Sequence, residues 1–187
     1  MVSAGELISR SYIEMQRTLH AAPRGYGGRG EKWAGIVLQV ALAYDAHSIL
    51  DYGCGQGSLK RVLSNLVTQD QAPVYRIDEY DPAIPGKDAL PEQFSDLVNV
   101  TDVLEHIEPE RLKAVLKHIR LLASKCVFVV ISTKESNKVL ADGRNAHVII
   151  ESPQWWKQQL REAGFTLHPP PSVTRVSSKE WVGVLTP

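Results

Sequence analysis

Short apolar runs along this chain alternate with longer segments in which apolar residues recur every three or four positions. Short apolar runs predict β-strands, and the most apolar of them, Cys126–Ser132, is typical of a strand buried on both faces. Glycine and proline residues, which favour turns, bound several of these runs. The expected strands are 48–52, 74–79, 96–100, 126–132, 165–168 and 180–185.

The segments with helical spacing predict helices between these strands. Ser3 and Ser152 are expected helix caps, Pro109 suits a first turn and Gly164 a helix end. The expected helices are 3–20, 31–46, 58 to about 68, 108–124 and 152–163, with loops at 21–30, 80–94 and 133–147. Because strands and helices alternate, and parallel strands need crossover connections, the sequence predicts an α/β domain with a mostly parallel sheet.

Size and composition favour one globular domain. The 187 residues suffice for a core, and 43% hydrophobic with 22% charged residues exclude a disordered or fibrous chain. The 21 basic and 21 acidic side chains balance, which disfavours a protein whose main task is to bind nucleic-acid phosphates. Cys54 and Cys126 cannot form a disulfide framework, so we expect a cytoplasmic location. The sequence shows no signal-peptide pattern and no apolar run near the roughly 18 residues that span a bilayer, so no membrane association is expected.

The first expected strand ends in a glycine-rich turn, Asp51-Tyr52-Gly53-Cys54-Gly55-Gln56-Gly57. Glycines permit a sharp turn and let a ligand approach the backbone, and open α/β sheets bind ligands beyond the carboxyl ends of their strands. Dinucleotide-binding loops need Gly-x-Gly-x-x-Gly, whereas here the third glycine comes one residue early and Ser58 follows it. Asp51 suits an ammonium group better than a pyrophosphate. The spacing therefore disfavours a nicotinamide oxidoreductase.

The pattern Asp51-x-Gly53-x-Gly55-x-Gly57 after a strand resembles motif I of the class I S-adenosylmethionine (SAM)-dependent methyltransferases. The resemblance extends from about Ile49 to Phe165, because segments similar to later family motifs follow in the family's order at 75–82, 94–107, 127–133 and 147–165. It implies a Rossmann-like, mostly parallel sheet with helices on both faces and an antiparallel strand near the C-terminus. It also implies SAM as cofactor and one domain over residues 1–187, with N-terminal helices and a lid loop (about 1–46) before the core.

In that family the glycine loop holds the methionine end of SAM, and an acid after the second strand holds the ribose. The resemblance therefore assigns the methionine end to Asp51, Gly53, Cys54, Gly55 and Gly57.

For the ribose, counting back from Pro82 favours Glu79, because a carboxylate accepts two hydrogen bonds from a vicinal diol. Asp78 and Asp81 are alternatives. The family's third strand is not visible in 82–93, where Asp88 is the candidate for adenine contacts. The other expected cofactor-binding residues are Tyr80, Thr101 and Asp102.

Four residues after the expected third and fourth strands are candidates for the methyl-acceptor site. If Asp102 opens a helical turn, Glu105 and His106 lie on its face, and His147 follows the 133–147 loop. Asp102 is expected to border the methyl group, and His106 or His147 is a candidate general base because imidazole titrates near neutral pH. The alternative is structural: Asp102 caps the turn and the others pack beneath the next helix.

The pattern Asp102-x-x-Glu105-His106 with a distant His147 also resembles the metal site of the small-RNA 2′-O-methyltransferases. That resemblance implies that all four residues hold a divalent cation, Mg²⁺ or Mn²⁺, which suits carboxylate-rich ligands. Many members of the wider family carry a similar stretch with no known metal, so a metal-free site is the alternative.

Two loops are candidates for covering the site. Arg24–Gly28 has the glycine content of a lid, with Tyr26 as its cover, and the alternative is a disordered connector. Asp142–Ala146 is a candidate acceptor-recognition loop in which Arg144 pairs with a carboxylate or phosphate, and the alternative is a solvated surface loop.

The sequence thus predicts a methyltransferase that moves the SAM methyl group to an oxygen or nitrogen nucleophile. The neutral charge favours a small molecule, a nucleotide or a sugar as acceptor over bulk nucleic acid, and a protein side chain is a further candidate. The alternative is a SAM-binding sensor or partner subunit that transfers no methyl group.

Overall fold

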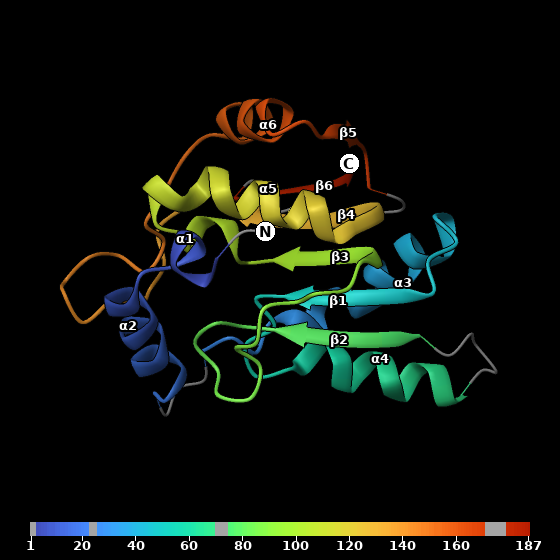
Figure 1. Cartoon of the computed structure of the whole chain (residues 1–187), viewed down its shortest axis with the longest axis horizontal. Helices are drawn as coiled ribbons and strands as arrows, with labels where there is room; N and C mark the ends of the chain where they lie inside the picture. The colour runs from blue at the N-terminus through green and yellow to red at the C-terminus, as the bar shows by residue number, and fades with distance from the viewer. Residues whose placement is uncertain (1–2, 23–25, 70–74, 171–178) are drawn as a thin grey trace.

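The computed structural model describes residues 3–22, 26–69, 75–170 and 179–187. Its centre is a six-stranded sheet in the order β2-β1-β3-β4-β6-β5 (Figure 1). β1 to β4 run parallel, and β6 is antiparallel to both β4 and β5. This topology confirms the predicted fold class. The strands are β1 (Ser48–Tyr52), β2 (Arg76–Tyr80), β3 (Ser95–Thr101), β4 (Ala123–Ser132), β5 (Thr166–His168) and β6 (Glu180–Thr186).

The helices alternate with these strands as expected, but several boundaries differ from the predicted ones. The predicted helix 31–46 ends at Ala43, and the predicted helix 108–124 ends at Leu122 because β4 already begins at Ala123. The α-helices are α1 (Ala4–Leu7), α2 (Arg10–His20), α3 (Ala34–Ala43), α4 (Ser58–Gln69), α5 (Leu112–Leu122) and α6 (Pro153–Glu162), and the 3-10 turns are η1 (Gly30–Trp33), η2 (Leu104–His106) and η3 (Pro109–Arg111).

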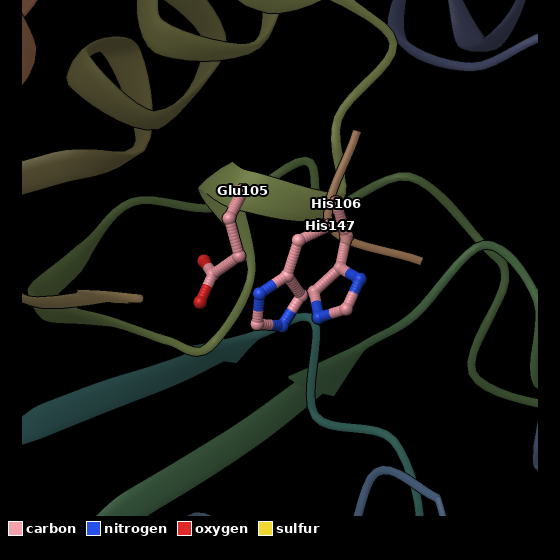
Figure 2. A group of neighbouring side chains, drawn as sticks. All are labelled: Glu105, His106 and His147. Atoms are coloured by element: carbon pink, nitrogen blue, oxygen red, sulfur yellow. The ribbon is translucent and has the colours of Figure 1, made fainter. Parts of the chain in front are cut away.

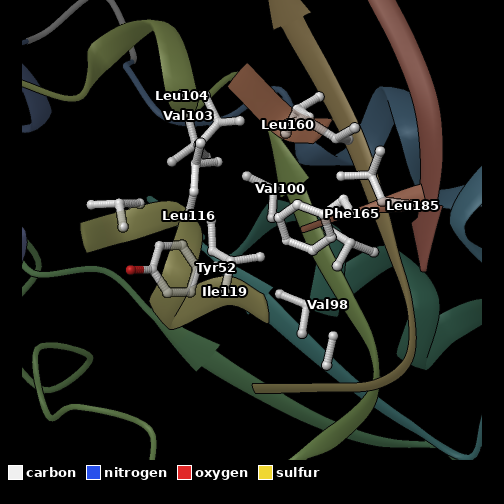
Figure 3. Close-up of a cluster of buried hydrophobic side chains, with 14 of the residues drawn as sticks. Tyr52, Val98, Val100, Val103, Leu104, Leu116, Ile119, Leu160, Phe165 and Leu185 are labelled. Atoms are coloured by element: carbon white, nitrogen blue, oxygen red, sulfur yellow. The ribbon is translucent and has the colours of Figure 1, made fainter. Parts of the chain in front are cut away.

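Successive strand residues point to opposite faces of the sheet, so the strands supply two apolar layers. Leu50 and Val98 pack with buried side chains of α5 and α6 (Figure 3). Their neighbours Ile49 and Leu97 pack with η1, α3 and α4 on the opposite face. Helices therefore cover both faces, as the resemblance implied.

The predicted single helix 3–20 is wrong, because the chain is extended at Ile8 and breaks between α1 and α2. Ser9 caps α2: its Oγ accepts a hydrogen bond from the Tyr12 N–H at 3.3 Å. The Ser9 N–H donates to the Glu108 carboxylate at 2.8 Å. The contact with Glu108, which is distant in the sequence, thus holds the chain at the break between α1 and α2.

The parallel strands direct their carboxyl ends toward α2 and the 133–147 segment, at the left of Figure 1. That segment holds one isolated bridge, Val139 with Asn145, and is otherwise a loop as expected. Residues 81–94 likewise contain neither helix nor strand, so no strand stands between β2 and β3 in the sequence. Within the four described stretches, every helix is too short or too polar to traverse a bilayer.

Candidate active site

A cavity of about 550 Å³ opens beyond the carboxyl ends of β1, β2 and β3. Its volume falls in the range of roughly 300–1,000 Å³ typical of small-molecule sites. The strand ends contribute Asp51, Tyr80 and Thr101 to its wall, while α2 and the segments 26–30 and 132–138 contribute much of the rest. The cavity therefore lies where open α/β sheets bind their ligands.

The glycine loop between β1 and α4 turns sharply, with φ of +75° at Gly53, +50° at Gly55 and +74° at Gly57. Gly53 and Cys54 line the cavity, whereas Gly55 and Gly57 pack against protein atoms. A Cβ on Gly55 would lie 2.4 Å from the carbonyl oxygen of Gly27, and a Cβ on Gly57 would lie 2.3 Å from Oε1 of Glu79. Close packing against backbone thus requires glycine at Gly55, whereas at Gly57, where the neighbouring atoms are ends of the movable Glu79 and Lys87 side chains, it is the positive φ that favours glycine.

The predicted lid segment lies directly on this loop. The Gly27 carbonyl accepts a hydrogen bond from the Gln56 N–H at 3.0 Å, so residues 26–30 cover the loop from the cavity side. Tyr26 lines the cavity, as expected for a cover, while Arg24 and Gly25 lie outside the described residues.

Asp51 lies one residue before the end of β1 in the cavity wall, and the residue is 3% exposed. Its Oδ1 accepts a hydrogen bond of 2.7 Å from Asn99, a fully buried residue of β3 that sequence reasoning missed. Burial raises the pKa of the Asp51 carboxyl to about 7. No ion pair reaches Asp51 from the described part of the chain. A buried carboxyl without a basic partner fits a ligand that carries a positive charge, such as a sulfonium amino acid.

Glu79, the expected ribose acid, is not among the residues that line the cavity. Its carboxylate pairs with Lys87 at 3.0 Å and lies 3.8 Å from the Lys60 ammonium. Asp88, the expected adenine contact, also lies outside the wall, 3.9 Å from Arg17.

Asp81, the alternative acid, lines the cavity and is 7% exposed. Its two carboxylate oxygens accept hydrogen bonds from the N–H groups of Gly55 and Ala83, each at 2.9 Å. These bonds fix Asp81 against the glycine loop at the end of β2. Tyr80 also lines the cavity, as expected.

Thr101, the last residue of β3, and Asp102, which follows it, line the cavity, as expected for residues bordering the methyl group. Asp102 has a φ of +55°, and its N–H donates to the Val130 carbonyl at 3.0 Å. Its carboxylate lies 3.9 Å from the Arg29 guanidinium, and burial raises its pKa. The helical turn begins two residues later than expected, at Leu104.

Three of the four expected acceptor-site residues come together at the end of η2. Glu105, His106 and His147 bring one ligand atom each to within 4.8 Å of one another, and Figure 2 shows the two imidazole rings beside the Glu105 carboxylate. The ring centroids of His106 and His147 are 4.7 Å apart. Asp102 is not a member of this group.

Hydrogen bonds to backbone carbonyls orient both imidazole rings. His106 Nδ1 lies 2.7 Å from the Ala146 carbonyl, and His147 Nδ1 lies 2.6 Å from the Lys134 carbonyl. A carbonyl only accepts, so each Nδ1 carries the proton and each Nε2 keeps its lone pair; His106 Nε2 lies 3.5 Å from the Tyr26 hydroxyl. Burial lowers the pKa of His106 to about 3, so this ring is neutral.

Glu105 is completely buried, and burial raises the pKa of its carboxyl to about 8. Its Oε1 accepts a hydrogen bond from the Ser132 N–H at 2.8 Å, whereas Oε2 is buried without a partner. An orphaned carboxylate oxygen beside two oriented imidazoles fits a divalent cation, because each group offers a lone pair.

The N-terminal helices supply a wall of the cavity that sequence reasoning missed. Tyr12 donates its hydroxyl to the His106 carbonyl at 2.7 Å, and the Tyr26 hydroxyl lies 3.0 Å from His106 Nδ1 and donates to Gln16 at 3.3 Å. The Tyr26 ring packs edge-on against His20 and His106. The helical spacing of apolar residues places Tyr12 on the apolar face of its helix. No local signal indicates that this face contacts His106, about 90 residues later in the sequence.

Arg144, expected to recognise the acceptor, lies outside the cavity wall. Its guanidinium pairs with Asp142 at 2.7 Å and lies over the Tyr12 ring. The loop Asp142–Ala146 is therefore held by its own contacts.

A cavity at the strand ends, a glycine turn and a buried acid define a small-ligand site of the Rossmann-like class. The sequence matches the family model described as a methyltransferase domain over residues 26–169, which is more than half of the chain. The chain belongs to this methyltransferase family, which confirms the predicted family. No curated protein matches the sequence.

Solved structures agree on the fold. A DhpI–SAH complex is 18% identical with a TM-score of 0.64 and covers 96% of this chain and 98% of that chain. A Burkholderia thailandensis 1,6-didemethyltoxoflavin-N1-methyltransferase with bound 1,6-didemethyltoxoflavin and S-adenosylhomocysteine is 16% identical with a TM-score of 0.58, covering 94% and 83%. The methyltransferase domain of a bacterial CtHen1 protein is 20% identical with a TM-score of 0.55, covering 82% and 97%.

Proposed function

We propose that this protein transfers the methyl group of SAM to an oxygen or nitrogen atom of a small-molecule acceptor. The observation that carries the proposal is the buried, unpaired Asp51 in the wall of a cavity that also contains two oriented histidines. The family membership supports methyl transfer, and the Burkholderia enzyme, which holds a small molecule and S-adenosylhomocysteine, supports the acceptor class.

In this proposal Asp51 pairs with the charged methionine end of SAM, Gly53 and Cys54 give it backbone contacts, and Asp81 holds the ribose. SAM supplies an activated methyl group, so the task of the chain is to position the acceptor and exclude water. Thr101 and Asp102 border the methyl group, and His106 and His147 face the acceptor with Nε2. Residues 26–30 shield the cavity from solvent.

Isothermal titration calorimetry with SAM and S-adenosylhomocysteine tests the proposal on the purified protein. We expect both to bind at one site per chain, and release of S-adenosylhomocysteine when an acceptor is present. Absence of binding would contradict the proposal. Binding without transfer to any acceptor would favour the alternative, a SAM sensor or partner subunit.

Asp81→Asn should weaken SAM binding about tenfold, whereas Glu79→Gln should change it less than about twofold. The reason is that only Asp81 of these two acids lines the cavity, and a lost charge-assisted hydrogen bond costs about 1.5–3 kcal/mol. Calorimetry on both variants measures the difference. The opposite order would restore Glu79 as the ribose acid.

We further propose that Glu105, His106 and His147 bind a divalent cation, and that Asp102 does not. Two imidazoles with one carboxylate suit Mn²⁺ better than Mg²⁺, which prefers oxygen ligands. A cation held there would supply Lewis-acid polarisation of an acceptor oxygen. The chain itself orients the site through the carbonyls of Ala146 and Lys134, which fix the two rings.

Chelator-treated protein should bind about one Mn²⁺ per chain, measured by calorimetry and by the electron paramagnetic resonance of free Mn²⁺. Glu105→Gln and His147→Ala should each lower the affinity at least about tenfold, because ligand loss in such sites is costly. Asp102→Asn is the matched control and should bind as the wild type does. Equal Mn²⁺ binding by all three variants would leave only the metal-free alternative.

A further inference from the structure

Two lysines stand in the cavity wall on the segment that follows β4. Lys134 and Lys138 line the cavity together with Ser136 and Asn137. Within the described residues, neither ammonium group has an ion-pair or hydrogen-bond partner. Both side chains belong to the part of the wall that carries His147, whose ring is hydrogen-bonded to the Lys134 carbonyl.

The main chain that carries these lysines is fixed. The Lys134 carbonyl accepts from His147 Nδ1 at 2.6 Å, and the Lys138 carbonyl accepts from the Ala146 N–H at 3.0 Å. Between them, the Ser136 N–H donates to Asn145 Oδ1 at 3.0 Å, and Asn145 Nδ2 donates back to the Ser136 carbonyl at 2.9 Å. The backbone positions are thus set before a ligand arrives, which reduces the ordering cost of binding.

The segment 132–138 itself carries a positive balance. Within this described segment Glu135 is the only acid that lines the cavity, so two ammonium groups stand beside one carboxylate. Elsewhere at the site, Asp51 and Glu105 have no ion-pair partner among the described residues, whereas several acids of the acceptor side face a basic group. The acids that face a base are Asp142 with Arg144 at 2.7 Å, Glu108 with Arg111 at 3.3 Å and Asp102 with Arg29 at 3.9 Å.

We propose that the methyl acceptor is an oxyanion, a carboxylate or a phosphoryl group, whose charge is held by the ammonium groups of Lys134 and Lys138. The inference rests on the proposed methyl transfer and names its substrate class. Ammonium groups bind such oxygens through charge-assisted hydrogen bonds, and the side chains of Ser136 and Asn137 add neutral donors.

The transfer balances without a base. One oxygen of the anion forms a bond to the methyl carbon while the carbon–sulfur bond breaks and its electron pair stays on sulfur. The acceptor loses one negative charge, the sulfonium loses its positive charge, and no proton has to be removed. An acceptor of this class therefore needs binding and positioning but no base, and the lysine wall provides both.

The test uses the full-length protein saturated with S-adenosylhomocysteine and four small probes at constant ionic strength. Acetate and inorganic phosphate are the anionic probes, ethanol is the neutral probe and methylammonium is the cationic probe. Binding of each probe is measured by ligand-observed nuclear magnetic resonance. We expect one or both anions to bind and the other probes not to bind. The double variant Lys134→Met/Lys138→Met should weaken anion binding about tenfold, and Lys134→Arg/Lys138→Arg should retain it.

Lys113→Met/Lys117→Met is the matched control, because both lysines are exposed on α5 outside the cavity wall. It removes the same charge and should leave anion binding unchanged. Anion binding that survives Lys134→Met/Lys138→Met, or that falls equally in the control, overturns the inference while leaving the proposed function intact. If the protein does not bind S-adenosylhomocysteine, the proposed function itself fails, and the inference that rests on it fails with it. Binding of acetate alone identifies a carboxylate acceptor, and binding of phosphate alone a phosphoryl acceptor.

Discussion

Gly55→Val is expected to abolish SAM binding, with an affinity loss of at least about 100-fold. Gly55 has a φ of +50°, which a β-branched residue adopts only with strain. A Cβ there would also lie 2.4 Å from the oxygen and 2.8 Å from the Cα of Gly27, and backbone atoms cannot move aside as a side chain can. Calorimetry with SAM measures the loss.

The variant acts through two contacts at once. The Gly55 N–H holds the carboxylate of Asp81, and the next N–H, that of Gln56, holds the cover at Gly27. Displacement of the loop therefore moves both Asp81, the proposed ribose acid, and the segment 26–30 that lines the cavity. Gly35→Val is the matched control, because a Cβ on Gly35 meets no atom within 4 Å.

Circular dichroism must show that both glycine variants retain the fold, and the milder Gly55→Ala replaces Gly55→Val if it does not. Wild-type affinity for SAM in a folded Gly55 variant would contradict the role of this loop.

The sequence allowed the central strands of the sheet to be predicted well because β1, β3 and β4 are buried on both faces over most of their length. β1 has the predicted bounds, and the apolar run 126–132 lies entirely within β4. β4 nevertheless begins three residues earlier than predicted, at Ala123, because the less apolar residues before the run also belong to the strand. The antiparallel C-terminal strand was expected from the resemblance to the family, and the lack of a strand between β2 and β3 was expected from residues 82–93 themselves, where the family's third strand is not visible.

What the sequence could not give was decided by contacts between distant segments. Helix 3–20 carries an unbroken helical period, yet Glu108 holds the Ser9 N–H and divides it. The prediction of Glu79 as the ribose acid, with Asp81 as an alternative, rests on counting from Pro82, and that count does not show that Asp81 accepts from the Gly55 N–H while Glu79 pairs with Lys87. Such choices depend on tertiary hydrogen bonds, which have no local signature.

The four residues expected at the acceptor site were likewise predicted correctly in part. The Glu105-His106 pair and His147 do meet, because η2 and the end of the 133–147 loop lie at the same edge of the sheet. Asp102 stays apart, since its left-handed backbone directs the carboxylate toward Arg29. The spacing of the motif thus located the site but not the membership of its ligand group.

Asp51→Asn is expected to weaken SAM binding about 100-fold at pH 8 and to remove its pH dependence. Burial raises the pKa of Asp51 to about 7, so the wild-type carboxyl is mostly ionised at pH 8 and mostly protonated at pH 6. Only the ionised form pairs with a cation. Wild-type affinity should therefore be about tenfold tighter at pH 8 than at pH 6, measured by calorimetry across this interval.

The raised pKa of Asp51 predicts that the stability of the ligand-free protein falls as the pH rises, whereas the affinity for SAM increases. Between the ordinary pKa of 3.8 and the raised value of about 7, the folded state binds more protons at Asp51 than the unfolded state does. Asp51 therefore stabilises the fold at the lower end of this interval, and its contribution is lost as the pH rises toward about 7. Thermal unfolding should show that Asp51→Asn, which can still accept the Asn99 hydrogen bond, loses less stability than the wild type from pH 5 to pH 8. Saturating SAM should reduce the wild-type loss, because its positive charge pairs with the ionised carboxylate. If wild type and variant show the same pH dependence with and without SAM, Asp51 does not face the charged end of the cofactor.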